Sequence, residues 1–128
     1  MKICIIGSGY VGLVSGACFS DLGNTVICVD INKQIIDKLN RGIIPIYEPG
    51  LHELVTRNLK KKRLLFSTDI SSSIKKSDII FICVGTPTKN NKADLKYVFN
   101  VTKSIKSNLN RYKIIVTKST IPVTTGDK

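Results

Sequence analysis

Three glycines near the start of the chain have the spacing that phosphate binding requires. Gly7, Gly9 and Gly12 follow an apolar run and precede a segment with helical periodicity. The first glycine permits a sharp turn, the second lets the backbone approach a pyrophosphate, and the third lets a helix lie close to a sheet. The N-terminus of that helix would offer unpaired N–H groups and a partial positive charge. The motif predicts a dinucleotide site; the alternative is a glycine turn without a ligand.

An acidic residue stands where the ribose of such a dinucleotide would lie. Asp30 ends the second expected strand, 18 residues after the last glycine. A carboxylate accepts hydrogen bonds from a free ribose diol, and charge-assisted bonds of this kind contribute about 1.5–3 kcal/mol each. The same carboxylate would repel a 2′-phosphate. The sequence therefore favours NAD over NADP as the ligand.

Glycine and hydroxyl residues follow two later apolar runs. Gly85 and Thr86 come after the run 79–84, and Thr120 comes after the run 114–116. If these runs are neighbouring parallel strands, their carboxyl ends lie beside the crevice in which such sheets bind ligands. We therefore expect Gly9, Thr86 and Thr120 around one cleft, where the hydroxyl groups could bind a cofactor and a substrate. The alternative is that the two threonines only cap the segments that follow.

The elements that would position these residues alternate between strands and helices. Apolar runs typical of strands buried on both faces occur at 3–6, 64–66, 79–84 and 114–116, and a further strand ends at Asp30. Segments with helical spacing separate them. This alternation predicts an α/β fold, namely a Rossmann-type doubly wound parallel sheet with helices on both faces and the strand order 3-2-1-4-5.

Capping residues and apolar stripes mark the expected helices. Asn32, Asp69 and Asp94 are suitable N-caps, and Gly23 and Gly42 are suitable C-terminal stops. Residues 85–88 predict a turn that cannot continue as helix. The stripes expected to face the core are, helix by helix, Val11, Val14, Cys18 and Leu22; Ile35, Ile36 and Leu39; Leu51, Leu54, Val55 and Leu59; Ile70 and Ile74; and Val98, Val101, Ile105 and Leu109.

Composition narrows the classes of protein. The 128 residues are enough for one domain, spanning 1–128, and 42% of them are hydrophobic. No apolar stretch approaches the roughly 20 residues of a membrane span, and the apolar N-terminus is too short for a signal peptide. We therefore expect a cytoplasmic protein with no membrane partner. The net charge is +11, but the basic residues are dispersed without aromatic interleaving, which favours a solvated surface over nucleic-acid binding.

The remaining reactive side chains indicate no catalytic centre of their own. Cys4, Cys18, Cys28 and Cys83 lack Cys-x-x-Cys spacing, and we interpret them as buried, reduced thiols. The single histidine, His52, lies off the apolar face of its helix and predicts a surface position. No cluster has metal-ligand spacing, so no metal site is expected.

Several longer segments resemble one known family. The chain is similar to the N-terminal domain of the UDP-glucose 6-dehydrogenase family, within the nucleotide-sugar dehydrogenases. The matching segments follow the family's order over essentially the whole chain, and the second and the last are the most specific. They are Gly7-Ser8-Gly9-Tyr10-Val11-Gly12-Leu13, Pro45-Ile46-Tyr47-Glu48-Pro49-Gly50-Leu51, Val84-Gly85-Thr86-Pro87-Thr88, Ala93-Asp94-Leu95 with Tyr97-Val98, and Lys118-Ser119-Thr120-Ile121-Pro122-Val123.

The resemblance implies NAD as the cofactor and a role for the first two motifs. In that family this domain binds NAD, and the full enzyme oxidises a sugar C6 alcohol to a carboxylate in two hydride transfers. By resemblance, the glycine turn with Tyr10 and Val11 would hold the pyrophosphate, and Asp30 would hold the ribose. Glu48 matches the family without a chemical step, and we interpret it as structural.

The resemblance also implies roles at the later strand ends. Gly85 and Thr86 would line the cofactor pocket. Thr120 would lie beside the nicotinamide and position a catalytic water or the sugar hydroxyl. The family usually has a basic residue five positions after the ribose acid, whereas this chain has Ile35, and Lys33 is a candidate substitute. Thr124 stands where the family commonly has glycine, so the turn there would be stiffer.

The family's catalytic cysteine and lysine lie in later segments than these 128 residues. We therefore expect the N-terminal part of a longer dehydrogenase, able to bind NAD without turnover on its own. By resemblance, the full-length form would be a homo-oligomer acting on a UDP-sugar, UDP-glucose first, in polysaccharide biosynthesis. A GDP-mannose or UDP-N-acetylmannosamine dehydrogenase stays open, because the substrate-reading residues lie elsewhere. A stand-alone nucleotide-sensing module is the alternative from another class, but it has no reason to carry Lys118-Ser119-Thr120.

Overall fold

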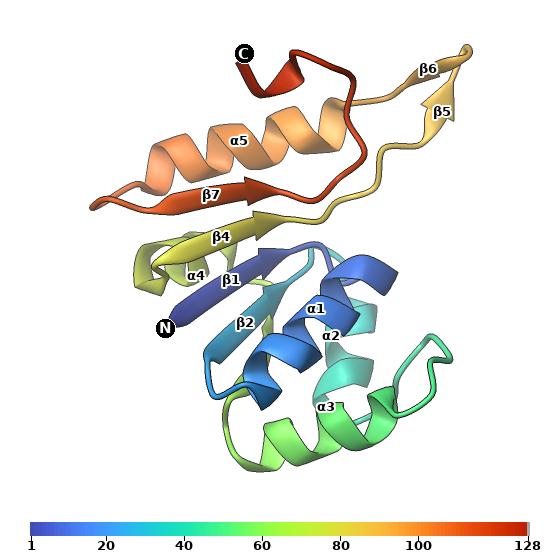
Figure 1. The fold of residues 1–128 in the computed structure, drawn as a ribbon, viewed down its shortest axis with the longest axis vertical. Helices are drawn as coiled ribbons and strands as arrows, with labels where there is room; N and C mark the ends of the chain where they lie inside the picture. Colours follow the sequence, from blue (N-terminus) through green and yellow to red (C-terminus); the bar gives the residue numbers. More distant parts are fainter. Residues whose placement is uncertain (128) are drawn as a thin grey trace.

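Five parallel strands form the centre of the computed structural model, which describes residues 1–127 (Figure 1). They are β1 (Lys2–Ile6), β2 (Thr25–Val29), β3 (Leu64–Ser67), β4 (Ile79–Ile82) and β7 (Ile114–Thr117). Their order across the sheet is β3-β2-β1-β4-β7, and every pairing is parallel. Because β7 is the fifth of these strands along the chain, the predicted order 3-2-1-4-5 is confirmed.

The central strand, β1, is apolar because both of its faces are covered. Cys4 and Ile5 are fully buried, and Ile3 and Ile6 are at most 4% exposed. Hydrogen bonds to β2 on one side and to β4 on the other satisfy its backbone. Ile3 and Ile5 belong to one core cluster, whereas Cys4 and Ile6 belong to the other. A strand in this position has no solvent-facing side on which polar residues could alternate.

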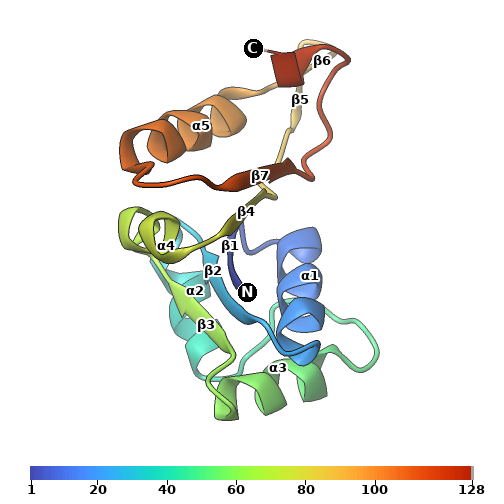
Figure 2. The ribbon, with the colours of Figure 1, turned by 60° about the vertical axis from the view of Figure 1, so that its left-hand side comes forward.

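Helices cover the two faces of the sheet in separate groups. Side chains of α1 (Tyr10–Asp21), α2 (Lys33–Asn40) and α3 (Leu51–Lys60) belong to the cluster that contains Ile3 and Ile5. Side chains of α4 (Ile70–Lys76) and α5 (Lys96–Asn108) belong to the other cluster or pack against it. Figure 2 shows α1 and α4 on opposite sides of the strands. The predicted doubly wound architecture is therefore confirmed.

Two of the three predicted N-caps are confirmed, and the third, Asp94, lies one residue before the observed N-cap. Asn32 Oδ1 accepts hydrogen bonds from the backbone N–H groups of Gln34 and Ile35 at 3.1 and 3.2 Å, and Asp69 Oδ1 accepts one from Ser72 at 3.0 Å. The N-cap of α5 is Leu95 rather than Asp94. Asp94 Oδ1 nevertheless accepts the N–H of Lys96 at 3.0 Å, so its side chain still serves the helix start.

The predicted core face of α1 is wrong at three of its four positions, and only Val14 packs against the core cluster. Cys18 is exposed, Val11 is 45% exposed and Leu22 is 79% exposed. The buried face instead carries small residues together with one leucine, namely Gly12, Leu13, Gly16, Ala17 and Ser20. A Cβ at Gly16 would lie 2.6 Å from the Cys28 sulfur, so α1 packs too close to β2 for larger side chains. Hydrophobic periodicity misplaces such a helix because it gives glycine and serine no weight as core residues.

Smaller corrections concern element ends and one hairpin. β4 ends at Ile82, two residues before the end of the predicted strand, and Leu109 is a 48% exposed C-cap of α5 rather than part of its core stripe. Where only a turn was expected, a hairpin forms from β5 (Thr88–Lys89) and β6 (Lys92–Ala93). Asn90 and Asn91 connect its strands with φ of 51° and 60°. Two consecutive left-handed residues are typical of the tight hairpin turn that asparagine favours.

Candidate functional site

Two of the three motif glycines are required by the packing of the protein itself. Gly7 follows β1 with φ of 106°, and its N–H donates to Val29 O at 2.8 Å. A Cβ at Gly7 would lie 2.6 Å from Cys83 O, and one at Gly12 would lie 1.9 Å from Gly7 O. The turn therefore closes tightly against the end of β4, and α1 starts directly over it.

The middle glycine meets no such constraint. Gly9 has ordinary extended backbone angles, and a Cβ built there would have no atom of residues 1–127 within 4 Å. It is the N-cap of α1, whose start has no side-chain cap and no acidic residue in its first turn within the described chain. The next two residues, Tyr10 and Val11, are exposed, and the first N–H groups of a helix have no partner within the helix. This arrangement fits an anionic diphosphate.

Asp30 connects the glycine turn to the start of α2. It directly follows β2, and its Oδ2 accepts the N–H of Ser8 at 2.9 Å while Oδ1 accepts the N–H of Asn32 at 2.9 Å. These two bonds fix the carboxylate at the carboxyl end of β2. A carboxylate oxygen that accepts one bond can accept another, so the partly exposed Asp30 can still receive ribose hydroxyls. The predicted neighbourhood of Asp30 and the glycine turn is confirmed in geometry.

A pocket of about 230 Å³ adjoins this pair. It lies between the carboxyl ends of β1 and β2 on one side and α4 and α5 on the other. Apolar walls with a few polar groups suit a nucleoside. The lining residues are Ile6, Gly7, Val29, Asp30, Ile31, Ile70, Val84, Tyr97, Asn100, Val101 and Ser104.

The contribution of α5 to this pocket was not predicted from the sequence. Tyr97, Asn100, Val101 and Ser104 line it from one side of that helix. Their spacing of three, four and seven residues places them on a single helical face. That spacing was available in the sequence, but only the tertiary structure shows that this face is turned toward the strand ends.

The later predicted residues lie at the same edge of the sheet but outside this pocket. Gly85 and Thr86 follow β4, and Thr120 follows β7, and Figure 1 shows both segments leaving the strands at the edge where α1 begins. Thr86 is partly buried, whereas Gly85 and Thr120 are exposed. The pocket beside Asp30 includes Gly7 but not Gly9, Gly85, Thr86 or Thr120. Their gathering around one cleft stays a prediction.

Ser119 ties the two segments together. Its hydroxyl donates to Val84 O at 2.7 Å, and its backbone N–H donates to Ile82 O at 3.1 Å. The N–H of Lys118 donates to the same Ile82 carbonyl at 2.9 Å. Thr120 is therefore held next to the exit of β4, where the Gly85-Thr86 turn begins. A fixed hydroxyl at this position could orient a small polar ligand.

Ile35, which stands where the related family usually has a basic residue, and Lys33, its candidate substitute, lie on different sides of α2. Ile35 is partly buried and packs against the core cluster under α1. Lys33 is the exposed first residue of α2, three residues after Asp30. The side chain at position 35 therefore packs in the core of this protein. Lys33 is the basic residue that lies closest to Asp30 along the sequence.

The cysteines offer no activated nucleophile at this edge. Burial raises the pKa of Cys4 to about 12 and raises the pKa of Cys28 and Cys83 as well. Cys18 is exposed on α1, which corrects the expectation that it is buried. It lies in the second half of that helix, roughly 12 Å along the axis from Tyr10 at about 1.5 Å per residue. Cys83 is only partly buried, so the expectation of burial is confirmed for Cys4 and Cys28 alone. A catalytic thiolate needs an accessible, electropositive setting with a lowered pKa, and Cys4, Cys28 and Cys83 instead have raised pKa values.

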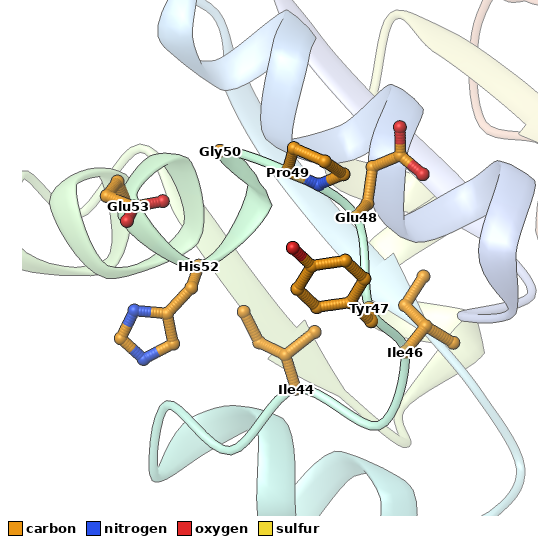
Figure 3. Close-up of a pocket in the computed structure, with 8 residues that line it drawn as sticks. All are labelled: Ile44, Ile46, Tyr47, Glu48, Pro49, Gly50, His52 and Glu53. Atoms are coloured by element: carbon orange, nitrogen blue, oxygen red, sulfur yellow. The ribbon is translucent and has the colours of Figure 1, made fainter.

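A second pocket, of about 340 Å³, lies beside the loop between α2 and α3 (Figure 3). Ile44, Tyr47, Glu48, His52 and Glu53 are among its lining residues. His52 is exposed, as predicted. Within residues 1–127, no group of three or more histidine, cysteine or acidic side chains could hold a metal ion. No helix in that range is long and apolar enough to cross a membrane.

Comparisons with known proteins agree with this geometry. Residues 1–128 match the model of the UDP-glucose/GDP-mannose dehydrogenase family, NAD binding domain. The chain is 56% identical over 126 residues to the UDP-glucose 6-dehydrogenase TuaD of Bacillus subtilis, covering 98% of this chain and 27% of the relative. It is 49% identical to the UDP-glucose 6-dehydrogenase of Rhizobium meliloti, covering 100% of this chain and 30% of that protein.

Solved structures of related enzymes share the fold. A GDP-mannose dehydrogenase from Pseudomonas aeruginosa superposes with a TM-score of 0.95 at 39% identity, covering all of this chain and 30% of that one. The UDP-N-acetyl-mannosamine dehydrogenase Cap5O from Staphylococcus aureus gives 0.91 at 36% identity, covering 100% and 31%. The chain thus spans less than a third of the length of these relatives. It belongs to the UDP-glucose/GDP-mannose dehydrogenase family, as that family's NAD-binding domain.

Proposed function

We propose that this chain is the NAD-binding part of a UDP-glucose 6-dehydrogenase, which oxidises UDP-glucose to UDP-glucuronate with two NAD. Curated relatives carrying that name reach 56% and 49% identity. GDP-mannose and UDP-N-acetylmannosamine dehydrogenases are the alternatives within the same chemistry, since solved structures with those names share the fold. In the full-length form, a UDP-sugar would be the second ligand, and the subunits would form a homo-oligomer.

The single observation that carries the proposal is the turn at Gly9 together with Asp30. The uncapped start of α1 would bind the diphosphate through the N–H groups of Tyr10 and Val11. Asp30 would accept hydrogen bonds from the adenosine ribose, and the pocket beside it would take the adenosine. When bound, NAD accepts a hydride from the alcohol carbon of the sugar. The residues described here bind and orient the cofactor.

Residues at the exits of β4 and β7 would serve the reacting end of the cofactor. Gly85 and Thr86 would line the pocket, and Thr120 would lie beside the nicotinamide and hold a water molecule or the sugar hydroxyl. The exposure of Thr120 and the anchoring of its neighbour Ser119 to Val84 O support this role. A fixed backbone with a free hydroxyl suits positioning.

Residues 1–128 alone would bind NAD without turnover. Oxidation to a carboxylate requires a nucleophile that holds the aldehyde between the two hydride transfers. Burial raises the pKa of Cys4, Cys28 and Cys83, so these thiols do not provide one. A steady-state assay with UDP-glucose and NAD should show no NADH formation by this chain, and sustained NADH formation would contradict this part of the proposal.

The cysteines and the charge of the chain support a proposal about its cellular compartment and its partners. All four cysteines are free, which supports a reducing, cytoplasmic compartment. The dispersed basic residues support a solvated surface and no nucleic-acid partner.

Calorimetric titration with NAD and with NADP tests the proposed function. The wild-type protein should bind NAD, and NADP should bind at least tenfold more weakly because its 2′-phosphate would meet Asp30. Asp30→Ala should weaken NAD binding by roughly tenfold, consistent with the loss of about 1.5–3 kcal/mol per charge-assisted bond. Equal binding of NAD and NADP, or unchanged NAD binding by Asp30→Ala, would contradict the assignment of Asp30.

A further inference from the structure

The first turn of α1 lacks the contact that normally fixes a helix start. Gly9 has no side chain with which to cap the helix, and within residues 1–127 no acidic residue lies in the first turn. The missing cap leaves N–H groups available to a ligand. It also leaves the first turn without a side-chain contact at its N-cap, an absence that for glycine costs roughly a few tenths of a kcal/mol. Some other interaction must hold this turn where a diphosphate can meet it.

One side-chain hydrogen bond takes that place. The Tyr10 hydroxyl donates to Oε2 of Glu48, which lies 38 residues further along the chain. Among the described residues, it is the one hydrogen bond that the side chains of residues 9–12 make. This hydrogen bond to the Glu48 carboxylate also raises the pKa of Tyr10 above its ordinary value.

Glu48 is itself held on a well-anchored loop. Its carbonyl accepts the N–H of Leu51, the first residue of α3, at 3.1 Å. Ile44 and Ile46 of the same loop pack against the core cluster under α1. Gly50 completes the entry into α3 with φ of 81°. Figure 3 shows the Glu48 side chain turned away from Tyr47 and His52, toward the blue ribbon of α1. The loop can therefore act as a fixed support for the first turn of α1.

We propose that Glu48 is a positioning residue for the cofactor: through Tyr10, it holds the first turn of α1 where the backbone N–H groups receive the diphosphate. The inference rests on the diphosphate site described under the proposed function. It gives a role in cofactor binding to Glu48, which the sequence analysis interpreted as structural.

The test compares ligands with and without a diphosphate. Titration calorimetry should show that Tyr10→Phe and Glu48→Ala each weaken NAD and ADP binding about fivefold, the loss expected from one net hydrogen bond. Adenosine has no phosphate, so its affinity should stay within about twofold. Glu48→Gln keeps an oxygen that accepts from Tyr10, and it should restore NAD affinity to within about twofold of the wild type. The double variant Tyr10→Phe with Glu48→Ala should bind no more weakly than either single variant.

Glu53→Ala is the matched control. Glu53 lines the same pocket and is exposed, and within residues 1–127 it makes no side-chain hydrogen bond to α1. This variant should bind NAD as the wild type does. Unchanged NAD affinity in Glu48→Ala would overturn the inference, and so would an equal loss for adenosine and ADP, which would indicate a general role in folding. Failure of the wild-type protein to bind NAD or ADP would instead contradict the proposed function.

Discussion

At the scale of single residues, Gly9 and Gly12 show that one residue type can meet two different requirements. A side chain at Gly12 would collide with the carbonyl of Gly7 inside the protein. A side chain at Gly9 would collide with nothing that the structure describes. Gly12 is thus needed for folding, whereas Gly9 is needed only if a ligand approaches the backbone there.

Alanine substitutions should separate these two requirements. Gly9→Ala should leave the melting temperature within about 2 °C of the wild type but weaken NAD binding at least tenfold, because its methyl group would occupy the diphosphate site. Gly12→Ala should lower the free energy of unfolding by several kcal/mol, since a backbone atom would have to move. Thermal unfolding and calorimetric titration check both. Full NAD affinity in Gly9→Ala would show that the space above it holds no ligand.

Thr124 is a residue in an unsuitable conformation. Its φ is 70°, a region that β-branched residues rarely adopt, and the related family commonly has glycine here. Strain of this kind costs of order 1–3 kcal/mol. Thr124→Gly should therefore raise the free energy of unfolding by about 1 kcal/mol in denaturant titrations, after the greater flexibility of glycine in the unfolded chain is subtracted. A lower stability would show that Thr124 makes a contact that offsets the strain.

At the scale of elements, α5 both covers the sheet and lines the pocket beside Asp30. Val98, Val101 and Ile105 face the core, and Val101 also lines the pocket beside Asp30. Tyr97, Asn100 and Ser104 complete the α5 side of that pocket. Replacing a small pocket-lining residue with a larger one should block the pocket without disturbing the core.

Ser104→Leu tests this division of α5. The larger side chain should reduce the affinity for NAD and for adenosine by at least tenfold, because both place an adenosine in the pocket. Lys103→Leu, on an exposed position one residue earlier, is the control and should leave both affinities unchanged. If Ser104→Leu binds adenosine normally, the adenosine site lies elsewhere.

Asp78 lies at the amino ends of the strands, at the side of the sheet opposite the candidate site, and its side chain contacts two other segments. Hydrogen bonds from the backbone N–H of Lys2, at 3.0 Å, and from Arg111 Nη1, at 2.6 Å, lower the pKa of its carboxyl group. The folded pKa then lies below the unfolded value of about 3.9. The contribution of this carboxylate to stability is therefore fully present above the unfolded pKa, and it is lost as the pH falls through the folded pKa.

Acid unfolding should reveal this linkage. Asp78→Asn should lower stability at pH 7, and the stability difference from the wild type should shrink below pH 4, where the wild-type carboxylate takes up a proton. Chemical denaturation at pH values from 3 to 7 measures the difference. Asp37→Asn, at an exposed position on α2, is the control and should show no such pH-dependent difference. A difference for Asp78→Asn that does not change with pH would contradict the account.

At the scale of the whole molecule, the sequence predicted the sheet better than it predicted the helix faces. The strands were predicted from apolar runs such as 3–6, because parallel strands buried on both faces leave a continuous signal. Their order was predicted from the usual arrangement of doubly wound folds. The close approach of α1 at Gly12 was predicted, but most of its buried face was missed because Gly16, Ala17 and Ser20 form part of its contact with the sheet. The hairpin at 88–93 was missed although Asn90 and Asn91 favour its turn.

The candidate site divides in the same way. The glycine turn and Asp30 were predictable because local spacing along one strand-helix-strand unit brings them together, and their neighbourhood is confirmed by the bond between Ser8 and Asp30. The α5 side of the pocket beside Asp30 and the Tyr10–Glu48 contact depend on segments distant in the sequence. No local pattern reports such a meeting, so they required the structure.

A crystal structure of the protein with NAD tests the central claim most directly. The account predicts electron density for the diphosphate within hydrogen-bond distance of the backbone N–H groups of Tyr10 and Val11. It also predicts that the ribose hydroxyls lie on Asp30 and the adenosine in the pocket beside Tyr97. Density for NAD at any other place, with the turn at Gly9 and the Asp30 pocket left empty, would contradict it.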